Sequence, residues 1–282
     1  RIASVIETTL NSYPMTEAQS GLWYAQRLDP HNPIFNTAHY IDIKGDLDVE
    51  AFKAAVDQVA EETQSLSLRF VENGTEVVQV IEPAHRPFLQ MLDVSTEADP
   101  EAAAMRAMQQ DHDTPVDPTR DPLAANILFR LAPRRHIWSL RVHHLATDGF
   151  GMVLIAYRVA ELYNASQGGA VPGAAFHPLS TVWEEDASYR LSEKREKDGA
   201  YWRELMGDTP EVASLASGKA VTAHTFHRVE RVLSPELTKR LLARSKAGNL
   251  SWPDVITTLT AAYVGRFSGA QEVVAGVPWM GR

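Results

Sequence analysis

Cysteine is absent from the 282 residues of this sequence. Its absence excludes disulfide bonds, thiolate metal sites and cysteine nucleophiles. Positive charge is scarce as well, because 27 Lys and Arg are outnumbered by 36 Asp and Glu, which gives a formal net charge of -9 at pH 7. A nucleic-acid-binding surface, or a surface for anionic membranes, needs concentrated positive charge, so the composition argues against both.

Long apolar runs are missing too. No stretch approaches the roughly 20 apolar residues that span a bilayer, and residues 1–7 lack the apolar core of a signal peptide. We therefore expect a cytoplasmic protein. The sequence does contain 44% hydrophobic and 22% charged residues, the composition of a soluble globular protein with one large core or two lobes.

Hydrophobic periodicity predicts strands and helices in alternation. Strands are expected where apolar and polar residues alternate, and helices where apolar residues recur every three or four positions. The predicted strands cover 39–43, 66–71, 76–81, 125–131, 136–142, 226–233 and 272–277, with Asn73-Gly74 as a hairpin signal. The predicted helices cover 49–59, 100–111 and 150–164, and two more begin at Pro235 and Pro253. One side of the helix 150–164 is expected to carry Val153, Leu154, Tyr157 and Leu162.

A loose stretch rich in Gly, Ala and Pro, 166–178, divides the predicted elements into two groups. We expect a first lobe of residues 1–178 and a second lobe of residues 179–282. The densely charged segment 184–198 mixes both signs, which favours a solvated helix over an interaction tail. Strands and helices alternating in two lobes predict an α/β protein built on open mixed sheets.

The most informative stretch is 141–149, Arg-Val-His-His-Leu-Ala-Thr-Asp-Gly, where a predicted strand meets a predicted helix. Adjacent histidines on an extended backbone point to opposite sides, so one of His143 and His144 can face a cavity while the other packs inside. A histidine held there can act as a general base, because its unperturbed pKa lies near 6.5. Asp148 suits the N-cap of the helix, and Gly149 lets a substrate approach its backbone N–H. A buried histidine pair beside a capping aspartate is the purely structural alternative.

The residues His143-His144-x-x-x-Asp148-Gly149 resemble the HHxxxDG motif of the condensation domains of nonribosomal peptide synthetases. Four further segments are similar to segments of that family and occur in the same order. They are 15–23 with its Ala-Gln and Leu-Trp pairs, 66–70, Trp183 with Tyr201-Trp202, and 276–282. The resemblance covers essentially the whole chain.

Two features depart from the family pattern. Ser67 occupies a position where family members usually have Arg, and Glu62-Thr63 occupies that of a usual Arg-His pair, so any ion pair built on that arginine is expected to be missing. The second departure is length. The second lobe of the family continues well past the segment that ends at Arg282, so the second lobe is expected to be incomplete here.

The resemblance implies an α/β (α+β) fold of two chloramphenicol-acetyltransferase-like lobes in a V-shaped pseudo-dimer, with the active site in a tunnel between them. It implies an acyltransferase that forms an amide bond between a donor acyl or peptidyl thioester and an acceptor aminoacyl thioester. Both substrates would arrive on the 4'-phosphopantetheine arms of donor and acceptor peptidyl or aryl carrier proteins, near an adenylation domain. The domain itself is expected to bind no cofactor and no metal. The opening Tyr13-Pro14-Met15 is similar to siderophore synthetases of the enterobactin type, which implies an aryl-acid donor.

The resemblance also assigns residues. The catalytic set would be His144, His143 and Gly149, with His144 facing the tunnel as base or orienting group for the amine and His143 supporting the loop. The Gly149 N–H would be a donor to the developing oxyanion. Asp148 would point into the protein and need a cation, since an unpaired buried carboxylate is costly. Arg282 is the expected partner, and Arg69 is the second choice.

Other members of the superfamily stay open as alternatives. An epimerisation domain keeps the histidines, and a coenzyme A-dependent acyltransferase shares His-x-x-x-Asp-Gly, although the Ala-Gln and Leu-Trp pairs of 15–23 favour condensation. A heterocyclisation domain would have aspartates in place of the histidine pair. A non-catalytic recruitment domain of the same fold typically loses the motif, which this chain keeps.

No metal or phosphate site is expected. His224 and His227 are three residues apart in a predicted strand, so they face opposite sides. The run Asp111-His112-Asp113 is interpreted as a solvated turn at the end of a helix rather than a cation site. The sequence contains no His-Glu-x-x-His, no Gly-x-Ser-x-Gly elbow and no Gly-rich phosphate loop.

Overall fold

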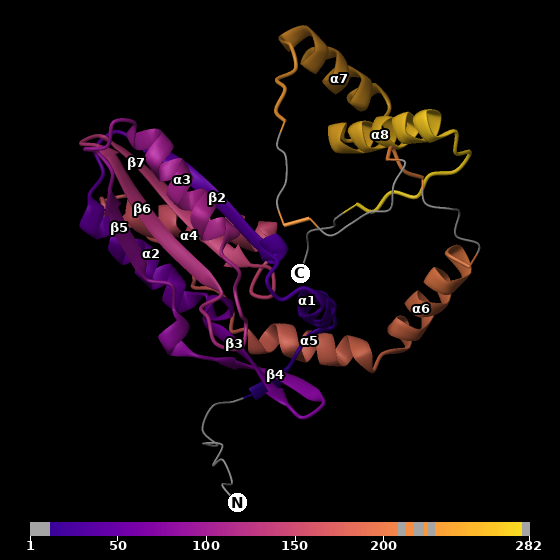
Figure 1. Ribbon diagram of the computed structural model, residues 1–282, viewed down its shortest axis with the longest axis horizontal. Helices are drawn as coiled ribbons and strands as arrows, with labels where there is room; N and C mark the ends of the chain where they lie inside the picture. The colour runs from indigo at the N-terminus through magenta and orange to yellow at the C-terminus, as the bar shows by residue number, and fades with distance from the viewer. Residues whose placement is uncertain (1–11, 208–212, 217–222, 225–228, 278–282) are drawn as a thin grey trace, which may run out of the picture. The chain divides into compact units, whose positions relative to one another are not determined.

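The computed structural model describes residues 12–207, 213–216, 223–224 and 229–277 (Figure 1). The described residues form two compact units, divided between Ser192 and Glu193. The first unit mixes helices with sheet, and the second is helical in its described part. None of the described helices is both long enough and apolar enough to cross a bilayer.

The first unit is built on a four-stranded sheet with the order β2-β7-β6-β5. Its strands are β2 (Asn36–Lys44), β5 (Leu89–Asp93), β6 (Ala124–Ala132) and β7 (Arg135–His143). Strands β2, β7 and β6 pair antiparallel, whereas β5 pairs parallel to β6. Strand β7 is therefore an inner strand, and the histidine pair lies at its carboxyl end.

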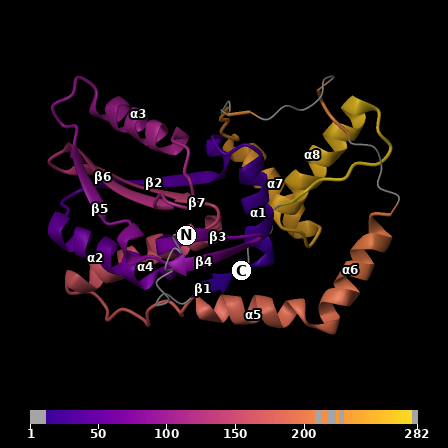
Figure 2. The ribbon, with the colours of Figure 1, turned by 60° about the horizontal axis from the view of Figure 1, so that its bottom comes forward.

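Helices cover both faces of this sheet, α2 and α4 on one side and α3 on the other (Figure 2). Their bounds are α2 Val49–Glu62, α3 Pro100–Asp113 and α4 Gly149–Ser166. Side chains of β7 alternate between the faces, as the period of two requires. Trp138 and Leu140 pack with α2 and α4, whereas Ile137 packs near Ala104 of α3.

A second, three-stranded sheet of the first unit has the order β1-β4-β3. Its strands are β1 (Ser12–Pro14), β3 (Leu68–Asn73) and β4 (Glu76–Ile81). The hairpin predicted at Asn73-Gly74 is confirmed, with Gly74 at φ 64°, a left-handed conformation that glycine adopts at little cost. Phe70 packs with Trp23 of α1 (Glu17–Leu28) and Trp183 of α5 (Ser180–Arg190).

The strands and helices predicted between residues 39 and 164 are confirmed, but one predicted helix face is wrong. The core side of α4 carries Met152, Ile155, Val159 and Leu162. Val153, Leu154 and Tyr157, predicted to share a side with Leu162, are exposed instead. Helix α4 has apolar residues on nearly every side, so the spacing of apolar residues does not show which side is buried.

The second unit contains α6 (Glu193–Leu205), α7 (Pro235–Ala247) and α8 (Trp252–Ser268). The helices predicted to begin at Pro235 and Pro253 are confirmed, with Ser234 and Ser251 as their N-caps. The charged segment 184–198 is helical apart from a break at 191–192, between α5 and α6.

Two strands predicted for the second unit are not found. Residues 229–233 and 272–277 form no strand, and 226–228 lie outside the described residues. A strand needs a neighbouring strand to pair its backbone groups. The described residues from 193 to 277 include no strand, so neither segment has such a neighbour.

Candidate active site

The loop between β7 and α4 is held by backbone hydrogen bonds. The N–H of His144 donates to the carbonyl oxygen of Phe35 (2.8 Å), which carries the β2–β7 pairing one residue beyond the strand. The N–H of Ala146 donates to the carbonyl of His143 (2.9 Å), and the Leu145 side chain is buried. The backbone of His144 is therefore fixed on both sides.

His143 is buried, with 1% of its surface exposed. Its Nδ1 accepts a hydrogen bond from the N–H of Leu145 (3.2 Å), so Nε2 carries the proton and donates to Gln26 Oε1 (3.3 Å). Burial, with smaller contributions from His144 and Arg141, lowers the pKa of His143 to about 4. A neutral, fully bonded imidazole supports the loop and does not face a substrate.

Gln26 of α1 is oriented by its own contacts. Its Nε2 donates to the carbonyls of Asp29 and Asn32, each at 3.1 Å. This leaves Oε1 as the atom that accepts from His143. Gln26 is 5% exposed, and the sequence did not single it out. Its contacts join residues more than a hundred positions apart, which no local pattern records.

The side chain of His144 contrasts with that of His143. It is partly exposed and makes no hydrogen bond to any described side chain or backbone group. Strand β7 ends at His143, and His144 is the first residue of the turn closed by the hydrogen bond from the Ala146 N–H to the His143 carbonyl, so its side chain does not follow that of His143 into the core. His144 thus has an accessible imidazole on a rigid backbone, which is what a proton-accepting or amine-orienting group needs.

Asp148 is the N-cap of α4, as predicted. Its Oδ1 accepts from the N–H of Gly151 (2.9 Å), and its carbonyl accepts from the N–H of Met152 (3.1 Å). Gly149 is the first residue of α4 and is exposed, so its N–H belongs to the free donors of the helix N-terminus. The positive end of the helix dipole favours negative charge at this point.

No cation among the described residues pairs with Asp148. The second-choice partner, Arg69, is wrong, because Arg69 Nη2 lies 3.5 Å from Glu82 Oε2 in an ion pair of its own. The first choice, Arg282, lies outside the described residues and stays a prediction. Within the described part, the Asp148 carboxylate is hydrogen-bonded by the N–H of Gly151.

A family model described as "Condensation domain" matches residues 9–282. The chain belongs to the condensation domain family. Condensation domains of nonribosomal peptide synthetases are acyltransferases that form amide bonds. The histidine pair, the capping aspartate and Gly149 described above carry the sequence HHxxxDG and form the candidate active site of this condensation domain.

The relatives are large synthetases. The chain is 42% identical to a dimodular nonribosomal peptide synthase of Bacillus subtilis (strain 168), over 96% of the chain and 11% of that protein. It is 39% identical to an isonitrile lipopeptide synthase of Streptomyces coeruleorubidus, over 95% of the chain and 18% of that protein. It is 31% identical to enterobactin synthase component F of Escherichia coli (strain K12), over 95% of the chain and 21% of that protein. The chain spans about a tenth to a fifth of these proteins.

Solved condensation domains have the same fold. A double mutant of the starter condensation domain of rhizomide synthetase RzmA, in complex with C8-CoA, matches with a TM-score of 0.82 and 34% identity over 93% of this chain and 59% of that one. The first condensation domain of the calcium-dependent antibiotic synthetase matches with a TM-score of 0.76 and 33% identity, over 93% and 63%. The predicted fold class, chloramphenicol-acetyltransferase-like with open mixed sheets, is confirmed.

The opening segment of the condensation domain contacts the loop directly. Gln19, near the N-terminus of α1, donates from Nε2 to the carbonyl of Leu145 (3.0 Å) and to Gln79 Oε1 (3.0 Å). Gln79 lies on β4 and is fully buried. Sequence reasoning recorded the Ala18-Gln19 pair as a family mark and missed both glutamines as site residues. Gln79 has no local signal at all.

Glu62, at the end of α2, forms an ion pair with a residue of α4. Glu62 accepts from Arg158 Nε (2.8 Å) and Nη2 (3.1 Å), which joins the end of α2 to α4. Arg158 is buried, and it also donates to Glu161 (2.7 Å) and the carbonyl of Gly173 (3.0 Å). Hydrogen bonds from Arg158 lower the pKa of the Glu62 carboxyl. This ion pair, in which α2 supplies the acid, differs from the pair whose absence the sequence predicts, and that absence stays a prediction.

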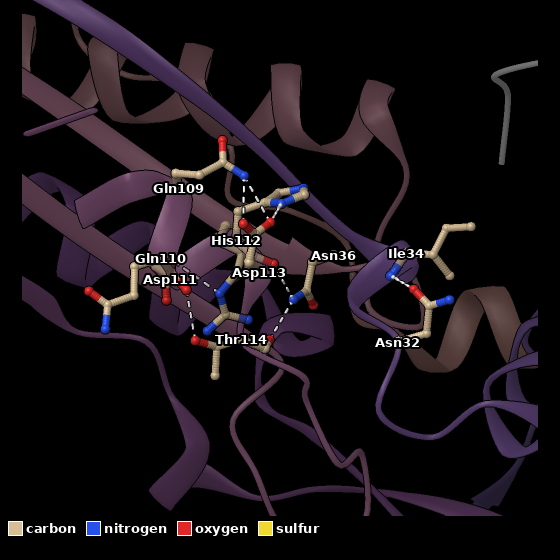
Figure 3. Close-up of polar contacts among 10 residues, drawn as sticks. Asn32, Ile34, Asn36, Gln109, Gln110, Asp111, His112, Asp113 and Thr114 are labelled. Carbon is tan, nitrogen blue, oxygen red and sulfur yellow. Dashed lines mark hydrogen bonds and ion pairs between the residues drawn. The ribbon is translucent and has the colours of Figure 1, made fainter. Parts of the chain in front are cut away.

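The side chains and carbonyls at the C-terminal end of α3 bind neighbouring strands of the sheet (Figure 3). Asp111 accepts from Arg141 Nε (3.0 Å), and Asn36 Nδ2 donates to the carbonyls of His112 and Thr114 at 2.8 Å each. The two contacts of Asn36 satisfy carbonyls that a helix leaves free at its C-terminus. The described residues, which exclude His227, include no group of three or more His, Asp or Glu placed to hold a metal ion.

Proposed function

We propose that this condensation domain joins a donor acyl group to the amine of an acceptor aminoacyl group, both held as thioesters on the phosphopantetheine arms of carrier proteins. The observation that carries the proposal is the contrast between the two histidines. His143 is buried, neutral and bonded at both nitrogens, whereas His144 is partly exposed and its imidazole bonds to none of the residues that the structure describes. The loop is built to present one imidazole.

In the proposed reaction, the acceptor nitrogen attacks the donor carbonyl carbon. The C–N bond forms, the C–S bond of the donor thioester breaks, and the donor arm leaves as a thiol. His144 takes the proton that the attacking amine loses, or holds that amine in line, and the proton passes to the leaving sulfur. The acceptor keeps its own thioester, so the elongated chain remains on the acceptor arm.

The carbonyl oxygen gains negative charge while the tetrahedral intermediate exists. The Gly149 N–H and the dipole of α4 are the stabilising groups that we assign to it, since both are at the exposed N-terminus of that helix. Asp148 fixes the first turn of α4 through the N–H of Gly151 (2.9 Å) and so acts on the geometry of that N-terminus. We propose that Asp148, in the predicted first lobe (1–178), pairs with Arg282, in the predicted second lobe (179–282).

We propose a donor without a free amine, as in a domain that starts a peptide. A starter condensation domain binding C8-CoA and an isonitrile lipopeptide synthase are among the relatives, which supports a fatty acyl donor. Similarity to an enterobactin synthase component supports the alternative, an aryl-acid donor. The partners would be donor and acceptor carrier proteins and an adenylation domain, because the relatives are large synthetases.

A second candidate is direct use of an acyl-coenzyme A as donor. The solved relative in complex with C8-CoA favours testing it. Coenzyme A ends in the same phosphopantetheine arm as a loaded carrier protein, so the reacting thioester is identical. The two donors differ in what surrounds that arm, a nucleotide in one case and a folded protein in the other.

The test measures amide product by mass spectrometry for the natural synthetase and its His144→Ala variant. Octanoyl and aryl groups are offered on the carrier protein and on coenzyme A, with an aminoacyl-loaded acceptor carrier. We expect product from the wild type and a fall of about 100-fold or more in the variant, the range for loss of a general base. His177→Ala, a change at an exposed loop histidine, is the matched control and should leave the rate unchanged.

Two outcomes oppose the proposal. Equal rates for the wild type and the His144→Ala variant would remove His144 from the chemistry. Absence of product with every donor, although loading of both carriers is confirmed, would favour the recruitment-domain alternative.

A further inference from the structure

Gln19 and Gln79 form a reciprocal amide pair beneath the histidine loop. Gln19 Nε2 donates to Gln79 Oε1 (3.0 Å), and Gln79 Nε2 donates to Gln19 Oε1 (2.8 Å). Gln19 is 8% exposed and Gln79 is 0% exposed. Two primary amides paired in this way use one donor and one acceptor each, which leaves one N–H on each side chain for other contacts.

Those remaining hydrogens bind backbone carbonyls. Gln19 Nε2 donates to Leu145 (3.0 Å), and Gln79 Nε2 donates to Pro14 (2.9 Å). Gln19 Oε1 also accepts from the N–H of Thr16 (3.0 Å). Every amide hydrogen of the pair is used, so neither amide can be reversed without opposing donor to donor or acceptor to acceptor.

The pair meets the histidine loop at the residue after His144. The N–H of Leu145 donates to His143 Nδ1 and its carbonyl accepts from Gln19, so the peptide groups on both sides of Leu145 are fixed. The N–H of His144 is fixed by Phe35. With its neighbours held, the backbone torsions of His144 have little freedom, and these torsions direct its imidazole.

We infer that Gln19 is a positioning residue for His144. The inference deepens the proposed function, since it concerns the same imidazole. An error of about 1 Å in the place of a reacting group costs on the order of 100-fold in rate. The Gln19 amide, which fixes the Leu145 carbonyl, can therefore change the rate of amide formation without touching substrate.

The amide pair offers a matched pair of variants. Gln19→Glu and Gln79→Glu each place one carboxylate in the same buried pair and change no volume. Gln19→Glu removes the donor to Leu145. Gln79→Glu keeps that donor, because its carboxylate still accepts from Gln19 Nε2 and loses only the donors to Gln19 Oε1 and Pro14.

We expect Gln19→Glu to lower kcat for amide formation by about 100-fold with KM for the carrier-bound substrates unchanged. Gln79→Glu should lower kcat far less, although both variants lose stability. Gln64→Glu is the neutral control, because the Gln64 amide accepts from the N–H of Leu179 (2.8 Å), a contact that a carboxylate also makes. Gln19→Met, which removes the donor without burying a charge, serves if Gln19→Glu does not fold.

A second readout does not need turnover. Ethoxycarbonylation of His144 by diethyl pyrocarbonate, mapped by peptide fragmentation, reports how its imidazole is held. We expect the rate at His144 to change several-fold in Gln19→Glu or Gln19→Met and to stay at the wild-type value in Gln79→Glu. Equal kcat in the Gln19 and Gln79 variants, or equal modification rates, would overturn the inference. A wild type that makes no amide would oppose the proposed function alone.

Discussion

At the scale of single residues, adjacent histidines of one motif have opposite properties. His143 is 1% exposed and its pKa is lowered to about 4, chiefly by burial. His144, one position later, is partly exposed, and its imidazole makes no hydrogen bond among the described residues. The difference arises where strand β7 ends, because His143 is its last residue and His144 is the first residue of the turn. His143 therefore supports the loop while His144 presents its imidazole, a difference that the motif alone does not show.

Burial of neutral His143 makes stability depend on pH. Between pH 6.5 and about 4 the unfolded chain binds a proton at this residue and the folded chain does not, so the free energy of unfolding falls as the pH falls. The full difference is about 3 kcal/mol. His143→Asn keeps an acceptor for the N–H of Leu145 and cannot be protonated, so its stability should depend less on pH in this range.

Urea unfolding of both proteins at pH 7 and pH 4.5 checks this expectation. Burial also lowers the pKa values of His39 and His136, so part of the slope should persist in His143→Asn. Identical slopes for the two proteins would show that His143 does not resist protonation. The contribution of Asp and Glu to the pH dependence is the same in both proteins and drops out of the comparison.

At the scale of elements, the ion pair between α2 and α4 fixes the helix that follows the histidine loop. Glu62 and Arg158 are 11% and 7% exposed at their side chains, so each would be costly without the other. Glu161, more exposed, adds a second carboxylate and also accepts from the N–H of Gly173 (2.7 Å). The network thus joins both helices to the loop that follows α4.

This ion pair predicts the outcome of a charge reversal. Glu62→Arg opposes the charge of Arg158 and should lower the free energy of unfolding by about 3 kcal/mol or more. Adding Arg158→Glu should recover only part of that loss, because the exchanged pair is restored while the contacts of Arg158 with Glu161 and the Gly173 carbonyl are lost. A double-mutant cycle by urea unfolding measures the coupling. Additive effects of the two changes would mean that the carboxylate and guanidinium do not interact.

The same elements show what the sequence could and could not predict. Asn73-Gly74 predicted its hairpin and Asp148 its helix cap, because both are local chemistry. The inward side of α4 was predicted wrongly, since apolar residues surround that helix. Gln79 and the pairing of Glu62 with Arg158 could not be predicted, because their partners lie 60 and 96 residues away.

At the scale of the whole molecule, the core is unevenly distributed. Every buried hydrophobic side chain of the described part lies between Met15 and Trp183, in the first unit. On α8, by contrast, Trp252, Leu259 and Phe267 follow a helical spacing and are all more than half exposed. The free energy that burial of apolar surface supplies to folding is therefore concentrated before Ser192.

This distribution predicts different behaviour of two fragments. Residues 1–192, with three hydrophobic clusters, should unfold cooperatively in urea when produced alone. Residues 193–282 should show a broad, non-cooperative transition, because their described helices bury almost no apolar surface. Circular dichroism against urea concentration measures both. A sharp transition of the second fragment by itself would contradict the prediction.

The amide pair under the histidine loop also bears on when the site comes into being during folding. Its contacts join residues 14, 19, 79 and 145, and the contact of Gln19 with Leu145 alone closes 126 residues of chain. Contacts that close long loops form late, because their entropy cost comes before their reward. A refolding chain therefore regains its helices first and the orientation of its reactive imidazole afterwards, so helical signal is a poor measure of competent enzyme.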